Sequence, residues 1–245
     1  MTPEQLFFLT AAVFVVAFLY SCVGHAGASG YIAVMSLFSV TPTVIKPTAL
    51  ALNILVACIG TWQFWRAGHF SWRLFWPFAV LAVPMAFLGG YLDLPTHVFK
   101  VMMGIVLLFS AAGFIFRPPE DSAARTPSRP VAISLGAGLG LLSGLTGTGG
   151  GIFLTPLLLF RRWARARTAA AVSALFILVN SVSGLLGTLS STKRFPSFAV
   201  VLAVAVIIGG SAGSYLGSQR FQHLTIKRLL AVVLLIAGLK LIFTP

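Results

Sequence analysis

Two short runs of small residues, GHAGASG (24–30) and TGTGGG (146–151), interrupt a chain that is otherwise almost continuously apolar. Glycine permits the left-handed dihedral angles of a tight turn and lets the backbone approach a ligand closely. Each run is followed by an apolar stretch that would begin as a helix, with the positive end of its dipole at the break. We therefore expect both runs to be breaks between helices.

The composition is that of a membrane protein. Of the 245 residues, 58% are hydrophobic and 9% are charged, and the mean hydropathy is +0.99. So few charges could not cover the surface of a soluble domain, and apolar runs of roughly 20 residues, long enough to span a bilayer, recur along the chain. The longest polar segment, RPPEDSAARTPSRP (117–130), is too short for a second domain. We predict one integral, all-α membrane unit.

The apolar runs between charges and turn residues predict ten helical segments. They lie at about 5–24, 28–39, 46–65, 72–92, 97–116, 131–145, 148–160, 168–190, 197–217 and 226–243. The second and the seventh are too short to cross a bilayer as helices. We expect each of these to join its predecessor in a broken or hairpin arrangement, at the start of each half of the chain.

The two halves of the chain resemble each other. Three pairs of stretches align: KVMMGIVLLFSAAGFIFRP (100–118) with KRLLAVVLLIAGLKLIFTP (227–245), GASGYIAVMS (27–36) with GTGGGIFLTP (147–156), and NILVACIGT (53–61) with NSVSGLLGT (180–188). Self-similarity of this kind indicates an internal repeat. We predict a first transmembrane repeat over 1–117, a cytoplasmic linker over 118–130 and a second transmembrane repeat over 131–245.

Charge distinguishes parallel from inverted repeats. If each half crosses the membrane an odd number of times, the loops at 66–73, 117–130, 161–167 and 219–228 share one side and hold 12 of the 17 Lys and Arg. If each half crosses an even number of times, about 9 Lys and Arg lie on one side and 8 on the other. The positive-inside rule does not favour so even a division. We therefore predict two inverted repeats of about five segments each. Such repeats with broken helices are typical of secondary transporters that bind substrate near the midplane.

The acidic residues limit the substrate. All four fall at segment ends or in loops: Glu4, Asp93, Glu120 and Asp121. Cation carriers and most proton-driven carriers place a carboxylate inside the membrane, so we expect an anionic or neutral substrate, no metal site and no cofactor. The basic residues are scattered among short loops and form no nucleic-acid-binding arm, so no nucleic acid partner is expected.

Backbone N–H groups and helix amino termini can hold an anion without a fixed positive charge. His25, Ser29 and Thr148 could add side-chain donors, although the glycines could instead serve close helix packing. Asn53 and Asn180 are the only asparagines, and a buried amide without a partner costs roughly 1–3 kcal/mol, so each contacts either substrate or another helix. The predicted site residues are Gly24, His25, Gly27, Ser29, Gly30, Asn53, Thr146, Gly147, Thr148, Gly149, Gly150, Gly151 and Asn180.

Ser29 in GASG (27–30) allows an alternative, an intramembrane serine protease. Its nucleophile would need a base within hydrogen-bond distance. His25 shares its tight turn, and the other histidines, at 69, 97 and 223, fall at loop or segment ends. The aligned residue of the second half is Gly149, so the serine is not repeated. We favour a role for the backbone and expect no enzymatic activity.

GLLSGLTGTGGGIFLTPLLL (140–159), followed by AAAVSALFILVNSVSG (169–184), resembles the hallmark of the sulfite exporter TauE/SafE family of membrane permeases. In that family a GxGGG....P run precedes an A.A.S helix. The second half matches at Gly147, Gly149, Gly150, Gly151, Pro156 and Ser173. The first half departs from the pattern at Ser29, Tyr31 and Ser36.

The resemblance implies transport of small sulfur oxyanions or organosulfonates, such as sulfite, thiosulfate, sulfoacetate or taurine-related compounds. It also implies a multi-pass protein of the bacterial cytoplasmic membrane. We predict alternating access between the two halves, with the anion held where the two Gly-rich breaks meet. The expected partners are a small anionic substrate and the lipid bilayer, and a homodimer is left open.

Overall fold

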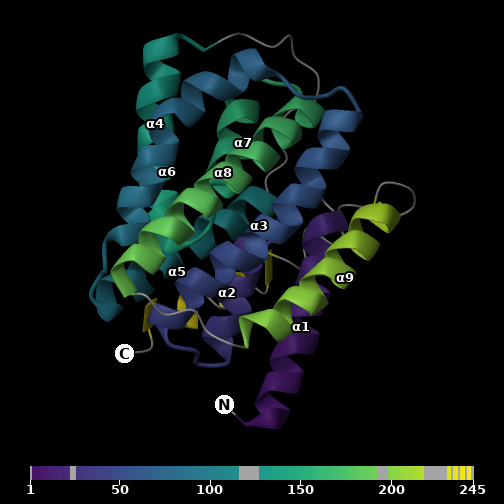
Figure 1. Ribbon diagram of the computed structural model, residues 1–245, viewed down its shortest axis with the longest axis vertical. Helices are drawn as coiled ribbons and strands as arrows, with labels where there is room; N and C mark the ends of the chain where they lie inside the picture. Colours follow the sequence, from purple (N-terminus) through teal and green to yellow (C-terminus); the bar gives the residue numbers. More distant parts are fainter. Residues whose placement is uncertain are drawn as a thin grey trace.

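The computed structural model describes residues 2–22, 26–115, 127–192, 198–217, 231–232, 234–236, 238–240 and 242–243. Every regular element in these ranges is an α-helix, which confirms the predicted all-α class (Figure 1). The labelled helices are α1 (Pro3–Cys22), α2 (Ala28–Leu37), α3 (Pro42–Arg66), α4 (Trp72–Tyr91), α5 (Thr96–Ile115), α6 (Arg129–Thr146), α7 (Gly151–Phe160), α8 (Ala166–Thr192) and α9 (Ala199–Gly217).

Helix length separates candidate membrane spans from half-spans. Among the described residues, four segments are long and apolar enough to cross a membrane: Pro3–Ser21, Pro42–Arg66, Trp72–Tyr91 and Arg167–Ser191. Helices α2 and α7 have 10 residues each, about 15 Å at 1.5 Å per residue, whereas the hydrocarbon core of a bilayer is about 30 Å thick. Both short helices therefore reach about halfway across, as the sequence predicts.

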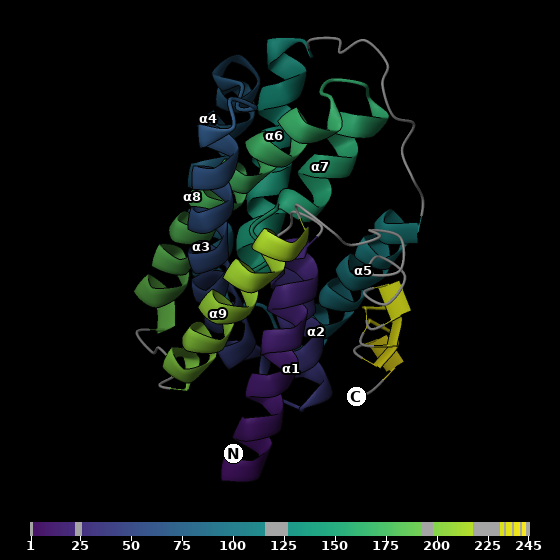
Figure 2. The same cartoon turned by 90° about the vertical axis from the view of Figure 1, so that its right-hand side faces the viewer.

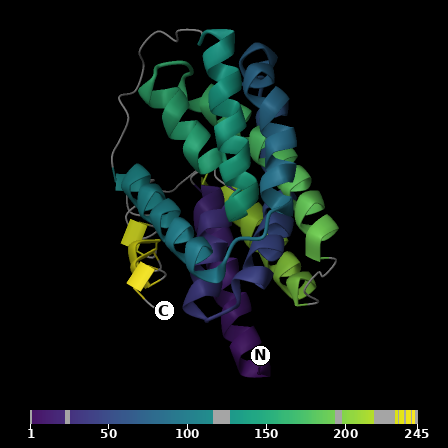
Figure 3. The same ribbon diagram turned by 90° about the vertical axis from the view of Figure 1, so that its left-hand side faces the viewer.

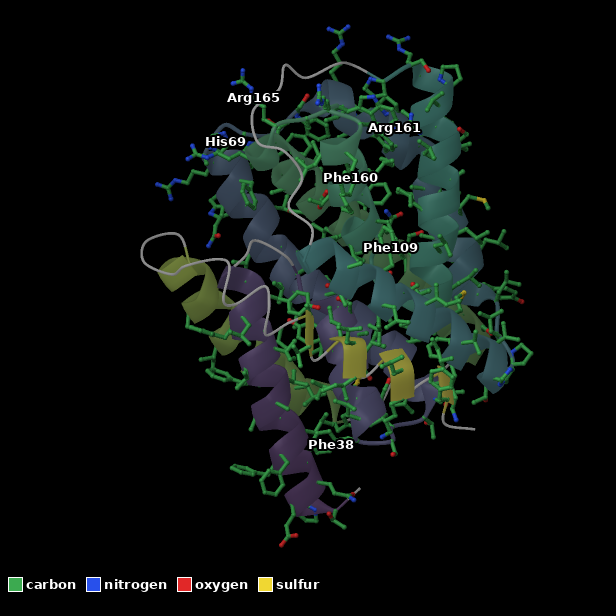
Figure 4. The ribbon with its side chains drawn as sticks, turned by 180° about the vertical axis from the view of Figure 1, so that it is seen from behind. Phe38, His69, Phe109, Phe160, Arg161 and Arg165 are labelled. Carbon is green, nitrogen blue, oxygen red and sulfur yellow. The ribbon has the colours of Figure 1, made fainter. Side chains whose placement is uncertain are left out.

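The hairpins α1–α2 and α6–α7 enter the molecule from opposite ends. Figure 4 places Phe38, which follows α2, toward the end that holds the start of α1. Phe160 and Arg161, at the end of α7, lie toward the other end. The starts of α2 and α7 consequently lie between these two ends (Figure 2).

Equivalent helices of the two halves pack in equivalent pairs. The fourth helix of each half packs against the first helix of the other, α4 against α6 and α9 against α1, while α3 and α8 pack against each other between them (Figure 3). Glycines spaced four residues apart permit the close approach, because a Cβ at Gly140 or Gly144 would collide with the α4 backbone. On α9, a Cβ at Gly213 would collide with the carbonyl of Phe18 in α1. For these glycines, close helix packing is the explanation.

The charge count predicts that four basic loops lie on the same side of the membrane. Residues from three of these loops lie close together in the structure. Residues of 71–77, 127–129 and 163–168 line one cleft, and these overlap the loops at 66–73, 117–130 and 161–167. The fourth loop, 219–228, lies outside the described residues.

The structure pairs the two breaks in a different register from the sequence alignment. Helix α2 begins after Gly27 and α7 begins after Gly150, and both glycines are left-handed, with φ of +93° and +78°. Gly27 therefore corresponds to Gly150 and not to Gly147. In this register Ser29 corresponds to Ile152, so its hydroxyl again has no counterpart in the second half.

Candidate functional site

The α6–α7 break is a buried turn with a left-handed backbone. Gly147, Gly149 and Gly150 have φ of +77°, +73° and +78°, and residues 146–150 are all buried. No side chain caps the amino terminus of α7. Because the first N–H groups of a helix have no partner within it, this terminus presents backbone donors inside the protein.

Asn53 of α3 holds this turn from the other half of the chain. Its Nδ2 donates to the carbonyl oxygen of Thr148 at 3.3 Å and to Oγ of Ser181 in α8 at 3.1 Å. A Cβ at Gly149 would collide with Nδ2 of Asn53 and lie 2.8 Å from Oγ of Ser181. Glycine at 149 is thus required both by its φ and by the lack of space. Of the two roles expected for Asn53, the interhelical hydrogen bond is present.

The two threonines of the turn use their hydroxyl protons within it. Oγ1 of Thr146 donates to the carbonyl oxygen of Leu142 at 2.6 Å and lies 2.8 Å from Oγ1 of Thr148. Since Thr146 gives its proton to Leu142, Thr148 is the donor between the two hydroxyls. In this arrangement the threonines brace the turn, and its remaining donors are backbone N–H groups.

Asn180 of α8 is different from Asn53. It is fully buried, and neither its Nδ2 nor its Oδ1 has a hydrogen-bond partner. It lies about one helical turn beyond Phe176, whose Cε1 would be 2.9 Å from a Cβ at Gly150. An unsatisfied buried amide costs about 1–3 kcal/mol, so α8 keeps unused hydrogen-bonding capacity about one turn from the residue that packs on the N-cap glycine of α7.

Two further polar atoms near the turn are buried without partners. Oγ of Ser143 in α6 has none, and its Cβ is 3.3 Å from the position of a Cβ at Gly150. Oδ1 of Asn53 has none either. Ser143 and Asn53 thus leave unpartnered oxygen atoms, and the uncapped α7 terminus leaves backbone donors, around the buried turn.

The α1–α2 break is lined by larger side chains. Gly27 precedes α2, and no side chain caps that helix. Ser29 is buried, and its Oγ lies 2.8 Å from the hydroxyl of Tyr20, either of which could donate. The Tyr31 hydroxyl has no partner and would be 2.9 Å from a Cβ at Gly27. Gly30 packs on Val16 and Tyr20, with no room for a Cβ.

Gly24 and His25, two of the predicted site residues, lie outside the described residues. The other eleven fall at the two breaks or on α3 and α8. Those of the second half surround the α6–α7 turn together with Asn53, whereas Gly27, Ser29 and Gly30 belong to the α1–α2 break.

Sequence reasoning missed four residues at these breaks, Tyr20, Tyr31, Ser143 and Ser181. Polar groups inside predicted apolar segments, close to a glycine-rich run, were the available signal. Sequence reasoning also missed Lys46, the first residue of the predicted segment 46–65, which is buried. Its Nζ donates to the carbonyl oxygens of Gly89 at 3.0 Å, Gly90 at 2.8 Å and Leu92 at 3.1 Å.

Lys46 therefore caps the carboxyl end of α4, where a cation complements both the free carbonyls and the helix dipole. The Lys46 backbone also touches the α6–α7 turn, because its carbonyl oxygen would be 3.2 Å from a Cβ at Gly147. Lys46 thus links the end of α4 to the turn.

The geometry does not support the protease alternative. Ser29 has Tyr20 as its hydrogen-bond partner, and a tyrosine hydroxyl is not the base that a serine nucleophile needs. The two histidines within the described residues are His69, in the loop before α4, and His97, in the first turn of α5. Figure 4 shows His69 toward the end of the molecule where α7 ends, away from Phe38.

The structure combines long apolar helices with two half-length helices, one of which begins at the buried polar turn after α6. This arrangement is that of a helical membrane transporter. The family model for the sulfite exporter TauE/SafE matches residues 9–241. The chain therefore belongs to the sulfite exporter TauE/SafE family, as the resemblance of residues 140–184 implies.

Similar proteins extend over nearly the whole chain. The probable membrane transporter protein y4hK of Sinorhizobium fredii (strain NBRC 101917 / NGR234) is 42% identical over 240 residues, which cover 96% of this chain and 97% of the relative. The probable membrane transporter protein YjnA of Bacillus subtilis (strain 168) is 25% identical over 246 residues, 91% of this chain and 94% of the relative. The probable membrane transporter protein YdhB of the same strain is 26% identical over 246 residues, which cover 94% of this chain and 98% of the relative. No solved structure matches the chain.

Proposed function

We propose that this protein is a secondary transporter that carries small sulfur-containing anions, such as sulfite, thiosulfate or organosulfonates, across the bacterial cytoplasmic membrane. The observation that carries the proposal is the fully buried Asn180, whose amide has no partner among the described residues, on the helix whose Phe176, Ile177 and Ser181 pack around the uncapped amino terminus of α7. An oxyanion would accept hydrogen bonds from both.

The donors at this break favour an anion over a cation. Backbone N–H groups and the positive end of a helix dipole bind oxyanions, and they do so more strongly where water is excluded. The two acidic residues that the structure describes, Glu4 and Asp93, are exposed, so no described carboxylate would repel an anion at the break. The amide of Asn180 can also discriminate among oxyanions, because it has two N–H donors.

Alternating access between two inverted repeats would move the anion. The entry of the two hairpins from opposite ends and the pairing of α4 with α6 and of α1 with α9 are the features that support inverted halves. Asn53 and Asn180 lie on α3 and α8, which pack against each other. Rocking of one half about this contact would expose the α6–α7 break first to one side of a multi-pass protein and then to the other.

Flux measurements in proteoliposomes test the proposal. Purified protein is reconstituted, and uptake of labelled sulfite, thiosulfate, taurine, sulfoacetate and acetate is compared with that of protein-free vesicles. We expect saturable flux of one or more of the sulfur anions, and little of acetate. No saturable anion flux in a preparation that remains folded would contradict the transporter. Peptide cleavage that is lost in Ser29→Ala would instead establish the protease.

A further inference from the structure

A cleft of about 770 Å³ opens where the loops before α4, α6 and α8 meet. Figure 4 shows two residues from this region, His69 and Arg165, toward the end of the molecule opposite the start of α1. Three arginines and three tryptophans are among the residues that line it: Arg73, Arg129, Arg165, Trp72, Trp76 and Trp163. The α6–α7 break is separate from it, since no residue of the turn lines the cleft.

The cleft is positively charged, and none of the described residues that line it is acidic. Arg73, Arg129 and Arg165 are exposed, and none of them makes an ion pair in the part of the chain that the structure describes. Glu4, near the start of α1, and Asp93, after the end of α4, are remote from it. Three like charges that line one cavity, with no counter-charge among the described residues beside them, favour an anionic ligand.

The backbone adds to this positive field. Helices α4, α6 and α8 all begin at the cleft, and the N-cap residues Ser71 and Ser128, which also line it, make no side-chain capping bond. The positive dipole ends of three helices therefore point to the region that holds the arginines.

An exposed apolar stripe leaves the cleft along α4. Trp72 and Trp76 stack with ring centroids 5.8 Å apart, and Val80, Pro84 and Leu88 continue the row at intervals of four residues, as a ridge inclined to the helix axis. All five are exposed. Tryptophan is enriched at the boundary between lipid tails and headgroups, so the stripe begins at that boundary and runs into the lipid-facing part of a membrane-spanning helix.

We propose that the cleft binds the phosphate of an anionic phospholipid, whose acyl chain lies along the α4 stripe. A small soluble anion would use the arginines and leave the stripe without a role. A zwitterionic lipid would also use the stripe, but it would bring the positive group of its headgroup toward the arginines. Basic pockets between transmembrane helices are suited to anionic headgroups for these reasons.

Native mass spectrometry of the full-length protein in detergent tests the proposal. The probes are phosphatidylglycerol and phosphatidylcholine with identical acyl chains. We expect phosphatidylglycerol to bind about tenfold more tightly or better, given the contribution of each arginine near a headgroup. The double variant Arg73→Gln/Arg165→Gln should lose this preference. The matched control Arg66→Gln/Arg162→Gln, which removes two arginines outside the cleft, should keep it.

Three outcomes would overturn the proposal. They are equal binding of the two lipids, an equal loss of preference in both double variants, and displacement of phosphatidylglycerol by millimolar inorganic phosphate, which would indicate a site for soluble anions. If the first double variant fails to fold, tryptophan fluorescence of the wild type decides. Brominated phosphatidylglycerol at low mole fraction should quench the tryptophan fluorescence more than brominated phosphatidylcholine does. This difference should be smaller in Trp76→Phe. Equal quenching by the two lipids would overturn the proposal.

Discussion

Both helix breaks precede a short helix, but one consists mainly of glycine backbone and the other is lined by larger side chains. The α6–α7 turn has three left-handed glycines and is held by Asn53 from another helix. The α1–α2 break has one left-handed glycine among its described residues, Gly27, and is filled by Tyr20, Tyr31 and Ser29. The second break is therefore shaped by the backbone and the first by side chains. Under the proposed function, we therefore expect backbone recognition of the anion at the second break.

A parallel difference separates the two asparagines. The Nδ2 group of Asn53 donates to Thr148 and to Ser181, so this side of its amide serves the structure of the turn. Asn180 is equally buried and has no partner, so its amide is free to bind a ligand. Under the proposed function, the same residue type thus has a structural role on α3 and a recognition role on α8.

The largest expected effect is that of Gly149→Ala. A left-handed φ costs a residue with a Cβ about 1–2 kcal/mol, and at this position the Cβ would also collide with the Asn53 amide. We expect severe destabilisation and loss of transport, measured by thermal unfolding and proteoliposome flux.

Gly68→Ala is the matched control for that change. Gly68 has φ of +72° and no atom within 4 Å of the position of a Cβ, so it isolates the cost of backbone strain. Equal melting temperatures for the two variants would show that the packing of Asn53 on the turn is unimportant.

A smaller effect is expected when the two asparagines are replaced by leucine, which is larger but has the same branching at Cγ and no polar side-chain atoms. Asn53→Leu leaves the Thr148 carbonyl without its side-chain donor and removes the Ser181 contact, so unfolding should become easier by about 1–3 kcal/mol. Asn180→Leu removes two unsatisfied polar atoms and should be neutral or stabilising. Thermal unfolding without added anion checks this, and an equal loss of stability in both variants would refute the division of roles.

The smallest effect is expected at the first break. Ser29→Ala removes one buried hydrogen bond to Tyr20, which is worth about 1 kcal/mol, and should leave the transport rate within a few-fold of the wild type. Flux and melting temperature are both measured. A complete loss of flux in a stable Ser29→Ala protein would show that a side chain of the first break, and not only the backbone of the second, binds the substrate.

Much of this fold follows from the sequence because its signals are strong. Apolar runs of spanning length and two glycine clusters, each followed by a short apolar stretch, suffice to predict an all-α protein with two half-length helices. The burial of Asn53 and Asn180 follows from their place in long apolar segments. The register between the breaks does not, because glycine-rich runs align almost equally well in several registers, and only the left-handed caps Gly27 and Gly150 fix it.

The partners of polar side chains could not be predicted, because they come from distant parts of the chain. Asn53 bonds to Thr148, 95 residues away, and Asn180 bonds to nothing, although both occupy the same kind of apolar context. Lys46 has the spacing of a loop charge, yet its carbonyl partners begin 43 residues further along the chain. Which polar groups are satisfied depends on how the helices pack, and that information is tertiary.

The most direct test is the sulfite-dependent shift in unfolding temperature of the wild type, Ser29→Ala and Asn180→Leu in the same detergent. A ligand at 100 times its Kd stabilises the native state by about 2.7 kcal/mol. We predict this stabilisation in the wild type and in Ser29→Ala, and its loss in Asn180→Leu, which should unfold at or above the temperature of the ligand-free wild type. Undiminished stabilisation by sulfite in Asn180→Leu would contradict the assignment of Asn180 to the binding site.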